Sequence, residues 1–250
     1  MREEPRLRVA AFRPDDERLA AAVSLLESLG ADPVPDPMLA VEPTESVPRS
    51  DADYVVLTSK TGVELAADAG WSPGEATVCA IGDATAAALR EAGYSVDVVP
   101  EEFSSSGLVS ALESEVAGTR IEVARSNHGS AVLTDGLEAA GAYVHETVLY
   151  RLVRPPESGE SAELAAAGEL DAALFTSSLT VRHFLAAAEE RGIREDAVAG
   201  LRDATVGTIG NPTKETAENA GIPVDIVPDR ADFETLACET VEAAAPTHRE

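Results

Sequence analysis

The sequence repeats itself at a fixed interval of 128 residues. Residues 81–100 read IGDATAAALREAGYSVDVVP, and residues 209–228 read IGNPTKETAENAGIPVDIVP. An interval of about one domain's length indicates two related domains rather than a solenoid of short repeats. The chain of 250 residues is long enough to hold two small domains.

Two further likenesses extend the repeat. Residues 53–59 (DYVVLTS) match residues 171–177 (DAALFTS), and a weaker likeness between residues 9–14 and 122–127 relates Arg13 to Arg125. These likenesses divide the chain into four segments, or modules, that alternate between a short type and a long type. Each short module is expected to supply two strands, and each long module three. One module of each kind would make a five-stranded, flavodoxin-like domain.

Short β-branched runs alternate with alanine-rich amphipathic segments along the chain. This alternation predicts an α/β fold, in which helices cover both faces of parallel sheets. The fifth strand of each sheet is expected at residues 95–99 and 224–227.

Two chain paths can combine the four modules. Sequence order would give domains at 1–100 and 120–228, whereas a nested path gives a discontinuous domain, 1–38 with 154–250, and an inserted domain, 39–153. Proline stiffens extended chain, so the Pro-rich stretches 32–48 and 150–159 suit two linking strands between domains. The nested path is therefore favoured.

The formal net charge of -26 excludes several classes of partner. Such a chain repels nucleic acid and anionic membranes. A cationic partner is one explanation, and a surface adapted to high salt is the other. Salt adaptation is favoured, because carboxylates are spread over every predicted helix and only two lysines remain, Lys60 and Lys214.

Targeting and metal-binding patterns are lacking. The N-terminus does not read as a signal peptide and no apolar stretch is long enough to span a bilayer, so we expect a cytoplasmic protein. Cys79 and Cys238 read as buried thiols. The histidines share no ligand spacing, so we expect no metal site; they are His128, His145, His183 and His248.

Five loops at predicted strand-to-helix junctions are rich in glycine and hydroxyl residues. They are Thr58-Ser59-Lys60, residues 82–85, residues 126–129 from Ser126 on, Thr176-Ser177-Ser178 and residues 210–213. Helix N-termini beyond parallel strands present free N–H groups and partial positive charge, which suits carboxylates or phosphates. Helix capping by Ser and Thr is the alternative for each loop. Five such loops in two matched domains favour anion binding across a cleft.

The cations of these loops support the same hypothesis. Lys60 and Lys214, the surviving lysines, both lie in them, and a polyanionic ligand would explain this. Arg13 and Arg125 at strand ends fit the idea, although each could instead pair with a neighbouring aspartate. No G-x-S-x-G elbow, P-loop or G-x-G-x-x-G motif is present. Catalysis would therefore rest on positioning and a few acid–base groups.

The ordered set of these motifs resembles the uroporphyrinogen-III synthase family. The matching elements are the two Thr-Ser strand ends, the two I-G-x-x-T motifs, residues 141–151 (GAYVHETVLYR) and residues 103–108 (FSSSGL), answered by residues 233–236. The resemblance covers almost the whole chain. It implies two flavodoxin-like domains with nested connectivity, joined by two linking strands.

The same resemblance implies a cofactor-free hydro-lyase reaction. The substrate would be hydroxymethylbilane, a linear tetrapyrrole with eight carboxylates, closed to uroporphyrinogen III with loss of water and inversion of ring D. Tyr150 aligns with a cleft tyrosine that would help the hydroxyl leave. Thr85, Thr213, Ser59 and Ser177 align with hydroxyls that would bind carboxylates. The chain departs from the family pattern around Lys60 and Lys214.

Two hypotheses follow. The first is an enzyme of tetrapyrrole biosynthesis, acting as a monomer on a small-molecule substrate. The second is a non-catalytic two-domain binding or sensor protein for an anionic tetrapyrrole. Retention of Tyr150 and of both I-G-x-x-T motifs favours the enzyme.

Overall fold

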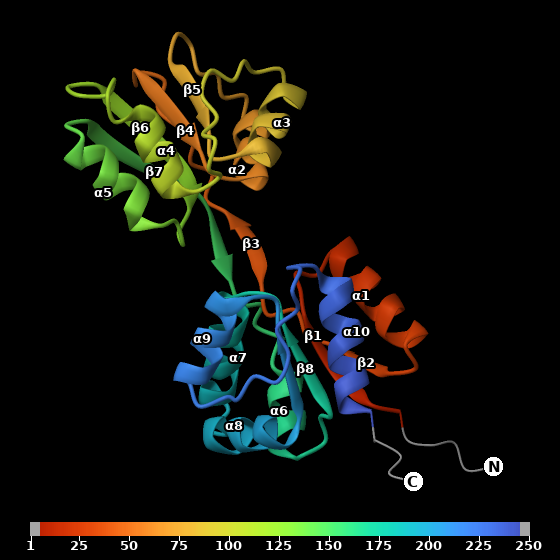
Figure 1. The fold of residues 1–250 in the computed structure, drawn as a ribbon. Helices are drawn as coiled ribbons and strands as arrows, with labels where there is room; N and C mark the ends of the chain where they lie inside the picture. Colours follow the sequence, from red (N-terminus) through yellow and green to blue (C-terminus); the bar gives the residue numbers. More distant parts are fainter. Residues whose placement is uncertain (1–5, 246–250) are drawn as a thin grey trace. The chain divides into compact units, whose positions relative to one another are not determined.

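The computed structural model describes residues 6–245, which fall into two units (Figure 1). Unit 1 comprises the segments up to Ala40 and from Val153 onward, and unit 2 is Val41–Leu152. The chain crosses from one unit to the other twice, within strand β3 (Ala40–Pro43) and at the end of strand β7 (Tyr143–Val153). His248 lies outside the described residues.

Unit 1 is built on a four-stranded sheet in which every strand pair is parallel. The strand order is β2 (Asp32–Pro35), β1 (Arg8–Phe12), β8 (Ala172–Phe175), β9 (Thr205–Thr208). One face packs against α1 (Glu17–Ser28) and α10 (Phe233–Ala244). The other face packs against α6 (Glu160–Ala166), α7 (Ser178–Glu190), α8 (Arg194–Asp203) and α9 (Asn211–Asn219).

Aromatic packing fixes the centre of unit 1. Side chains alternate along β1, so Val9 and Ala11 face α1 and α10 while Phe12 faces the other helix layer. The ring of Phe12 lies 4.5 Å from that of Phe175 and 5.7 Å from that of Phe184. All three rings are fully buried, so this layer contributes much of the apolar burial in the unit.

Unit 2 has the same architecture with one more strand. The order is β3, β7, β6 (Arg120–Ser126), β4 (Tyr54–Leu57), β5 (Thr77–Ala80). Helices α2 (Lys60–Asp68) and α3 (Asp83–Glu91) cover one face. Helices α4 (Ser105–Leu112) and α5 (Ala131–Ala139) cover the other. The predicted α/β class with parallel sheets is confirmed.

The sequence repeat corresponds to a repeated hydrogen bond. The carboxylate of Asp97 accepts from the backbone N–H of Val78 at 2.8 Å, and that of Asp225 accepts from Val206 at the same 2.8 Å. In both units this aspartate ties an otherwise irregular segment to an edge strand. The segments predicted as fifth strands make only one isolated bridge each, Cys79–Val98 and Gly207–Ile226. A short edge segment with one bridge thus replaces the expected ladder.

Three helices were not predicted from the sequence. Helix α6 has only 7 residues, too few for an apolar period to be recognised. Helix α2 contains a glycine and is only 9 residues long, and only residues 191–193 separate α8 from α7. Such short helices owe their stability to packing rather than to propensity.

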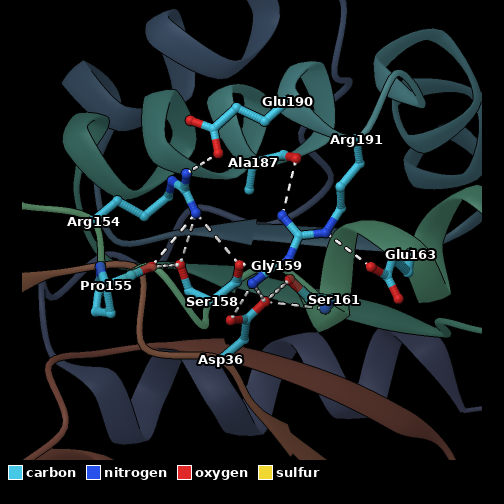
Figure 2. Close-up of polar contacts among 10 residues, drawn as sticks. All are labelled: Asp36, Arg154, Pro155, Ser158, Gly159, Ser161, Glu163, Ala187, Glu190 and Arg191. Carbon is cyan, nitrogen blue, oxygen red and sulfur yellow. Dashed lines mark hydrogen bonds and ion pairs between the residues drawn. The ribbon is translucent and has the colours of Figure 1, made fainter.

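A buried carboxylate organises the start of α6 in unit 1 (Figure 2). Asp36 is 2% exposed and accepts hydrogen bonds from the backbone N–H groups of Gly159 and Ser161 and from the Ser161 hydroxyl. Beside it, Arg154 contacts Ser158 and forms an ion pair with Glu190. Asp36 therefore caps a helix that lies more than a hundred residues away in sequence.

Within residues 6–245 no helix is both long and apolar enough to cross a membrane. Cys79 is buried, Cys238 is partly buried, and both are free thiols.

Candidate functional site

In each unit the predicted loops gather at one edge of the sheet, where the parallel strands end. In unit 2, Ser59 and Thr85 follow β4 and β5 at this edge. Ser126 is the last residue of β6, and Tyr150 lies late in β7. In unit 1 it carries Arg13, Ser177 and Thr213, which follow β1, β8 and β9. Ligands of open α/β sheets bind at such edges.

Tyr150 and Ser59 are in direct contact in unit 2. The Tyr150 hydroxyl donates a hydrogen bond to Ser59 Oγ at 2.9 Å. Tyr150 is 7% exposed and packs in the core beside Leu149. The phenol is therefore held in one orientation by its ring contacts and by one hydroxyl partner.

The helix N-termini at these edges are of two kinds. Ser59 Oγ accepts from Gly62 N at 3.0 Å and caps α2, and Ser177 Oγ accepts from Thr180 N at 3.2 Å and caps α7. Both serines therefore act as helix caps, which was the expected alternative to ligand binding at these loops. Neither observation tests their predicted contact with a ligand.

Helices α3 and α9 begin without a side-chain cap. Their N-cap residues are glycines, Gly82 and Gly210, so the first-turn N–H groups have no capping side chain to which they can donate a hydrogen bond. Thr85 and Thr213 lie in these first turns, each 4% exposed, and the structure describes no hydrogen-bond partner for either hydroxyl. Uncapped N–H groups with a nearby hydroxyl and the positive end of the helix dipole form an anion-binding arrangement.

An exposed phenylalanine stands beside the uncapped end of α3. Phe103 is 57% exposed, and a Cβ added at Gly82 would lie 3.1 Å from its Cβ and Cγ atoms. Gly82 has extended backbone geometry open to any residue, so what favours glycine here is the close approach of Phe103. Phe103 was not among the predicted site residues, although an aromatic side chain within a polar loop is a usable signal.

Arg13 of unit 1 is also held by an aromatic ring. Its guanidinium carbon lies 4.5 Å from the centroid of the Phe233 ring. Burial, together with the nearby positive charge of Arg18, lowers the pKa of Arg13 from its usual value. The cation stays protonated at any physiological pH, and the stacked geometry keeps its N–H fork at the strand end.

Arg125 lies inside unit 2. Its side chain is 7% exposed, forms an ion pair with Glu146, and donates to the backbone carbonyl of Ser130 at 2.6 Å. The partner is a glutamate and not the aspartate of the alternative expectation, and the contact braces the loop before α5. Ser126, in that loop, accepts from the backbone N–H of His128 at 3.3 Å.

The two lysines have local acidic partners. Lys60 lies 3.5 Å from Glu64 and Lys214 lies 3.7 Å from Glu218, each one helical turn away. Both side chains are substantially exposed, and exposed pairs of this kind contribute little free energy. Their ammonium groups therefore remain available to a ligand at small cost.

Among the described residues no group of three or more His, Cys, Asp or Glu side chains is placed to hold a metal ion. The candidate groups are thus hydroxyls, backbone N–H groups and arginines.

Comparison with known proteins connects this arrangement to one family. The family model described as uroporphyrinogen-III synthase HemD matches residues 20–238. This chain belongs to the uroporphyrinogen-III synthase family. A relative from Methanothermobacter thermautotrophicus, provisionally named a uroporphyrinogen-III synthase, is 34% identical over 238 residues, which cover 89% of this chain and 92% of the relative.

Solved structures share the fold. A mutant uroporphyrinogen III synthase from the extremely thermophilic bacterium Thermus thermophilus superposes with a TM-score of 0.68 at 21% identity, covering 95% of this chain and 98% of that one. The uroporphyrinogen-III synthetase of Helicobacter pylori 26695 gives a TM-score of 0.60 at 14% identity, with 96% and 100% coverage. At such identities the likeness supports the synthase fold alone.

Proposed function

We propose that the chain catalyses the reaction of its family, the closure of hydroxymethylbilane to uroporphyrinogen III with inversion of ring D and loss of water. The observation that carries the proposal is the family match over residues 20–238. The geometry of the sheet edges supports the roles proposed below for individual residues.

Tyr150 is the proposed proton donor to the leaving hydroxyl. Loss of that hydroxyl as water needs a proton, and a phenol already fixed in orientation can supply one or stabilise the departing oxygen by hydrogen bonding. Ser59 accepts the hydrogen bond from Tyr150 at 2.9 Å and so keeps the phenol aligned. The leaving oxygen of the substrate would then replace Ser59 as the acceptor. Elimination leaves an azafulvene, which cyclises through a spiro intermediate.

The uncapped starts of α3 and α9 are the proposed carboxylate sites. Each carboxylate placed at a helix N-terminus gains roughly 0.3–1 kcal/mol. Thr85 and Thr213 would each add a hydroxyl donor, and Arg13, Lys60, Lys214, Ser126 and Ser177 are proposed as further contacts. Arg125 would act from inside unit 2 by shaping the loop that presents Ser126.

Control of shape is the proposed source of product specificity. The bilane closes spontaneously to the uninverted isomer, so the protein must lower one closure barrier more than the other. Several weak carboxylate contacts can hold a flexible tetrapyrrole in the conformation that leads to the spiro intermediate.

Isomer analysis tests the proposal. Bilane made in situ is supplied to the protein, the products are oxidised, and isomers I and III are separated by chromatography. Isomer III in excess is the expected result. Isomer I alone would contradict the enzyme and leave the non-catalytic binding protein, which the family match over residues 20–238 disfavours. We also propose a cytoplasmic monomer, and light scattering after size exclusion tests the oligomeric state.

A further inference from the structure

A second candidate site lies at the opposite edge of the unit 2 sheet, where β6 and β7 begin. The register of these strands places Arg120 beside Tyr143 and Glu122 beside His145. Side chains alternate along a strand, so these four lie on one face of the sheet. A pocket of about 530 Å³ is lined by these four residues and by Arg49, among others. A volume of this size is typical of small-molecule sites.

The carboxylate in this pocket is incompletely paired. Glu122 is fully buried, and its Oε2 shares a hydrogen bond of 2.7 Å with His145 Nδ1. Its Oε1 has no hydrogen-bond partner among the described residues. An unsatisfied buried carboxylate oxygen is unfavourable, and a donor supplied by a ligand would relieve this. Both carboxylate oxygens turn together about the terminal torsion, so the donor has to approach Oε1 from the pocket while Oε2 keeps its bond to His145.

The pocket also offers an unpaired cation. Arg120 lies 3.4 Å from both Asp51 and Asp53 and is neutralised by them. Arg49 is exposed, and the described residues provide it with no ion pair. In a chain with a net charge of -26, a free arginine beside a pocket is a specific place for an anionic group.

The third feature is an exposed aromatic wall. Tyr143 is 71% exposed at the start of β7. Its ring presents an apolar face next to the polar groups, which is the usual composition of a small-molecule site.

We propose that this pocket binds a small zwitterion, an aromatic α-amino acid. Its ammonium group donates to Glu122, its carboxylate pairs with Arg49, and its ring packs on Tyr143. The pocket lies at the sheet edge opposite Ser59, Thr85 and Tyr150, so it is a separate site from the one proposed for the synthase reaction.

Three related probes separate the contributions. Isothermal titration uses L-phenylalanine, phenethylamine, which lacks the carboxylate, and 3-phenylpropionate, which lacks the ammonium group. We expect L-phenylalanine to bind with Kd below about 1 mM and the two truncated probes to bind about tenfold more weakly or worse. No heat of binding with L-phenylalanine at about 10 mM would overturn the proposal. So would equal affinity for all three probes.

Variants locate the binding. Arg49→Met should weaken L-phenylalanine binding about tenfold, because an ion pair is lost. Arg90→Met, an exposed arginine of α3 outside the pocket, is the matched control and should bind as the parent does. Glu122→Gln should reduce L-phenylalanine and phenethylamine binding but not 3-phenylpropionate binding. Should it fail to fold, Arg49→Met decides alone, and unchanged affinity there would refute the site.

Discussion

The Tyr150 hydroxyl donates to Ser59 Oγ at 2.9 Å, across 91 residues of sequence. The contact joins a central strand of unit 2 to the capped start of α2. It places a phenolic proton at the sheet edge, beside a serine whose oxygen already accepts from Gly62 N. The hydroxyl proton is therefore directed by a fixed acceptor.

Removing this hydroxyl should slow the reaction without unfolding the protein. Tyr150→Phe keeps the buried ring, and we expect the rate of bilane closure to fall about tenfold or more. Single-turnover kinetics measures the rate. Tyr94→Phe is a matched control, since the Tyr94 hydroxyl also makes one buried bond, to the Trp71 carbonyl at 2.7 Å, away from the site. An unchanged rate in Tyr150→Phe would remove Tyr150 from the mechanism.

The threonines of the uncapped helices should affect binding more than chemistry. Thr85→Ala and Thr213→Ala each remove one hydroxyl, and we expect affinity to fall about three- to tenfold with little change in maximal rate. Titration of product-analogue fluorescence gives the affinity. If both variants bind as tightly as the parent, the hydroxyls do not contact the ligand.

Cys79 should be inert toward alkylating reagents in the folded protein. Burial, with a smaller contribution from the charge of Asp97, raises the pKa of the Cys79 thiol to about 12. Because the thiolate is the reactive form, raising the pH from 7 to about 9 should leave Cys79 unlabelled by iodoacetamide. Cys238, only partly buried, is the internal comparison. Labelling of Cys79 before Cys238 in mass spectrometry would contradict this prediction, and both should react after denaturation.

Asp36→Ala should destabilise unit 1. The change leaves the buried N–H groups of Gly159 and Ser161 without their acceptor (Figure 2). We expect a loss of about 2–4 kcal/mol in the free energy of unfolding, measured by urea denaturation. Asp32→Ala removes an aspartate whose side chain is 61% exposed, and should cost at most about 0.5 kcal/mol. Equal midpoints for the two variants would show that Asp36 does not act as a buried cap.

Salt should stabilise the protein. With a net charge of -26, like-charge repulsion acts against the folded state at low ionic strength. Added salt screens that repulsion, so the melting temperature should be higher in molar potassium chloride than in dilute buffer. An equal or higher melting temperature in dilute buffer would argue against salt adaptation.

The repeat allowed much of the fold to be predicted, because strand and helix periods recur in matched order. Short elements escaped prediction for a physical reason. The segments around Val98 and Ile226 have strand-like composition, yet each forms one bridge because an aspartate side chain, Asp97 or Asp225, occupies the neighbouring N–H. Such competition between side chain and ladder depends on three-dimensional placement.

The sequence predicted where the residues of the candidate site lie in the fold better than it predicted which partners their side chains contact. Strand ends marked Ser59, Thr85 and Tyr150, since parallel strands bring their carboxyl ends together. The pairing of Arg125 with a glutamate was not predicted, because the sequence pattern does not place Glu146 beside it. The pocket around Glu122 could not be predicted from the sequence. A single glutamate inside an apolar strand only interrupts the apolar pattern and does not indicate a binding site.

Because α3 and α9 lack side-chain caps, the thermal stability of the protein should depend on whether its ligand is bound. Gly82 and Gly210 have no side chain to cap α3 and α9, so these helices lack the stabilisation that a capping serine gives to α2 and α7. An anion that occupies these turns restores it, but only in the folded state, so the melting temperature should rise with ligand concentration. Serine at Gly210, where an added Cβ would meet only Pro212 Cδ at 4.0 Å, would raise the unliganded melting temperature and reduce that response.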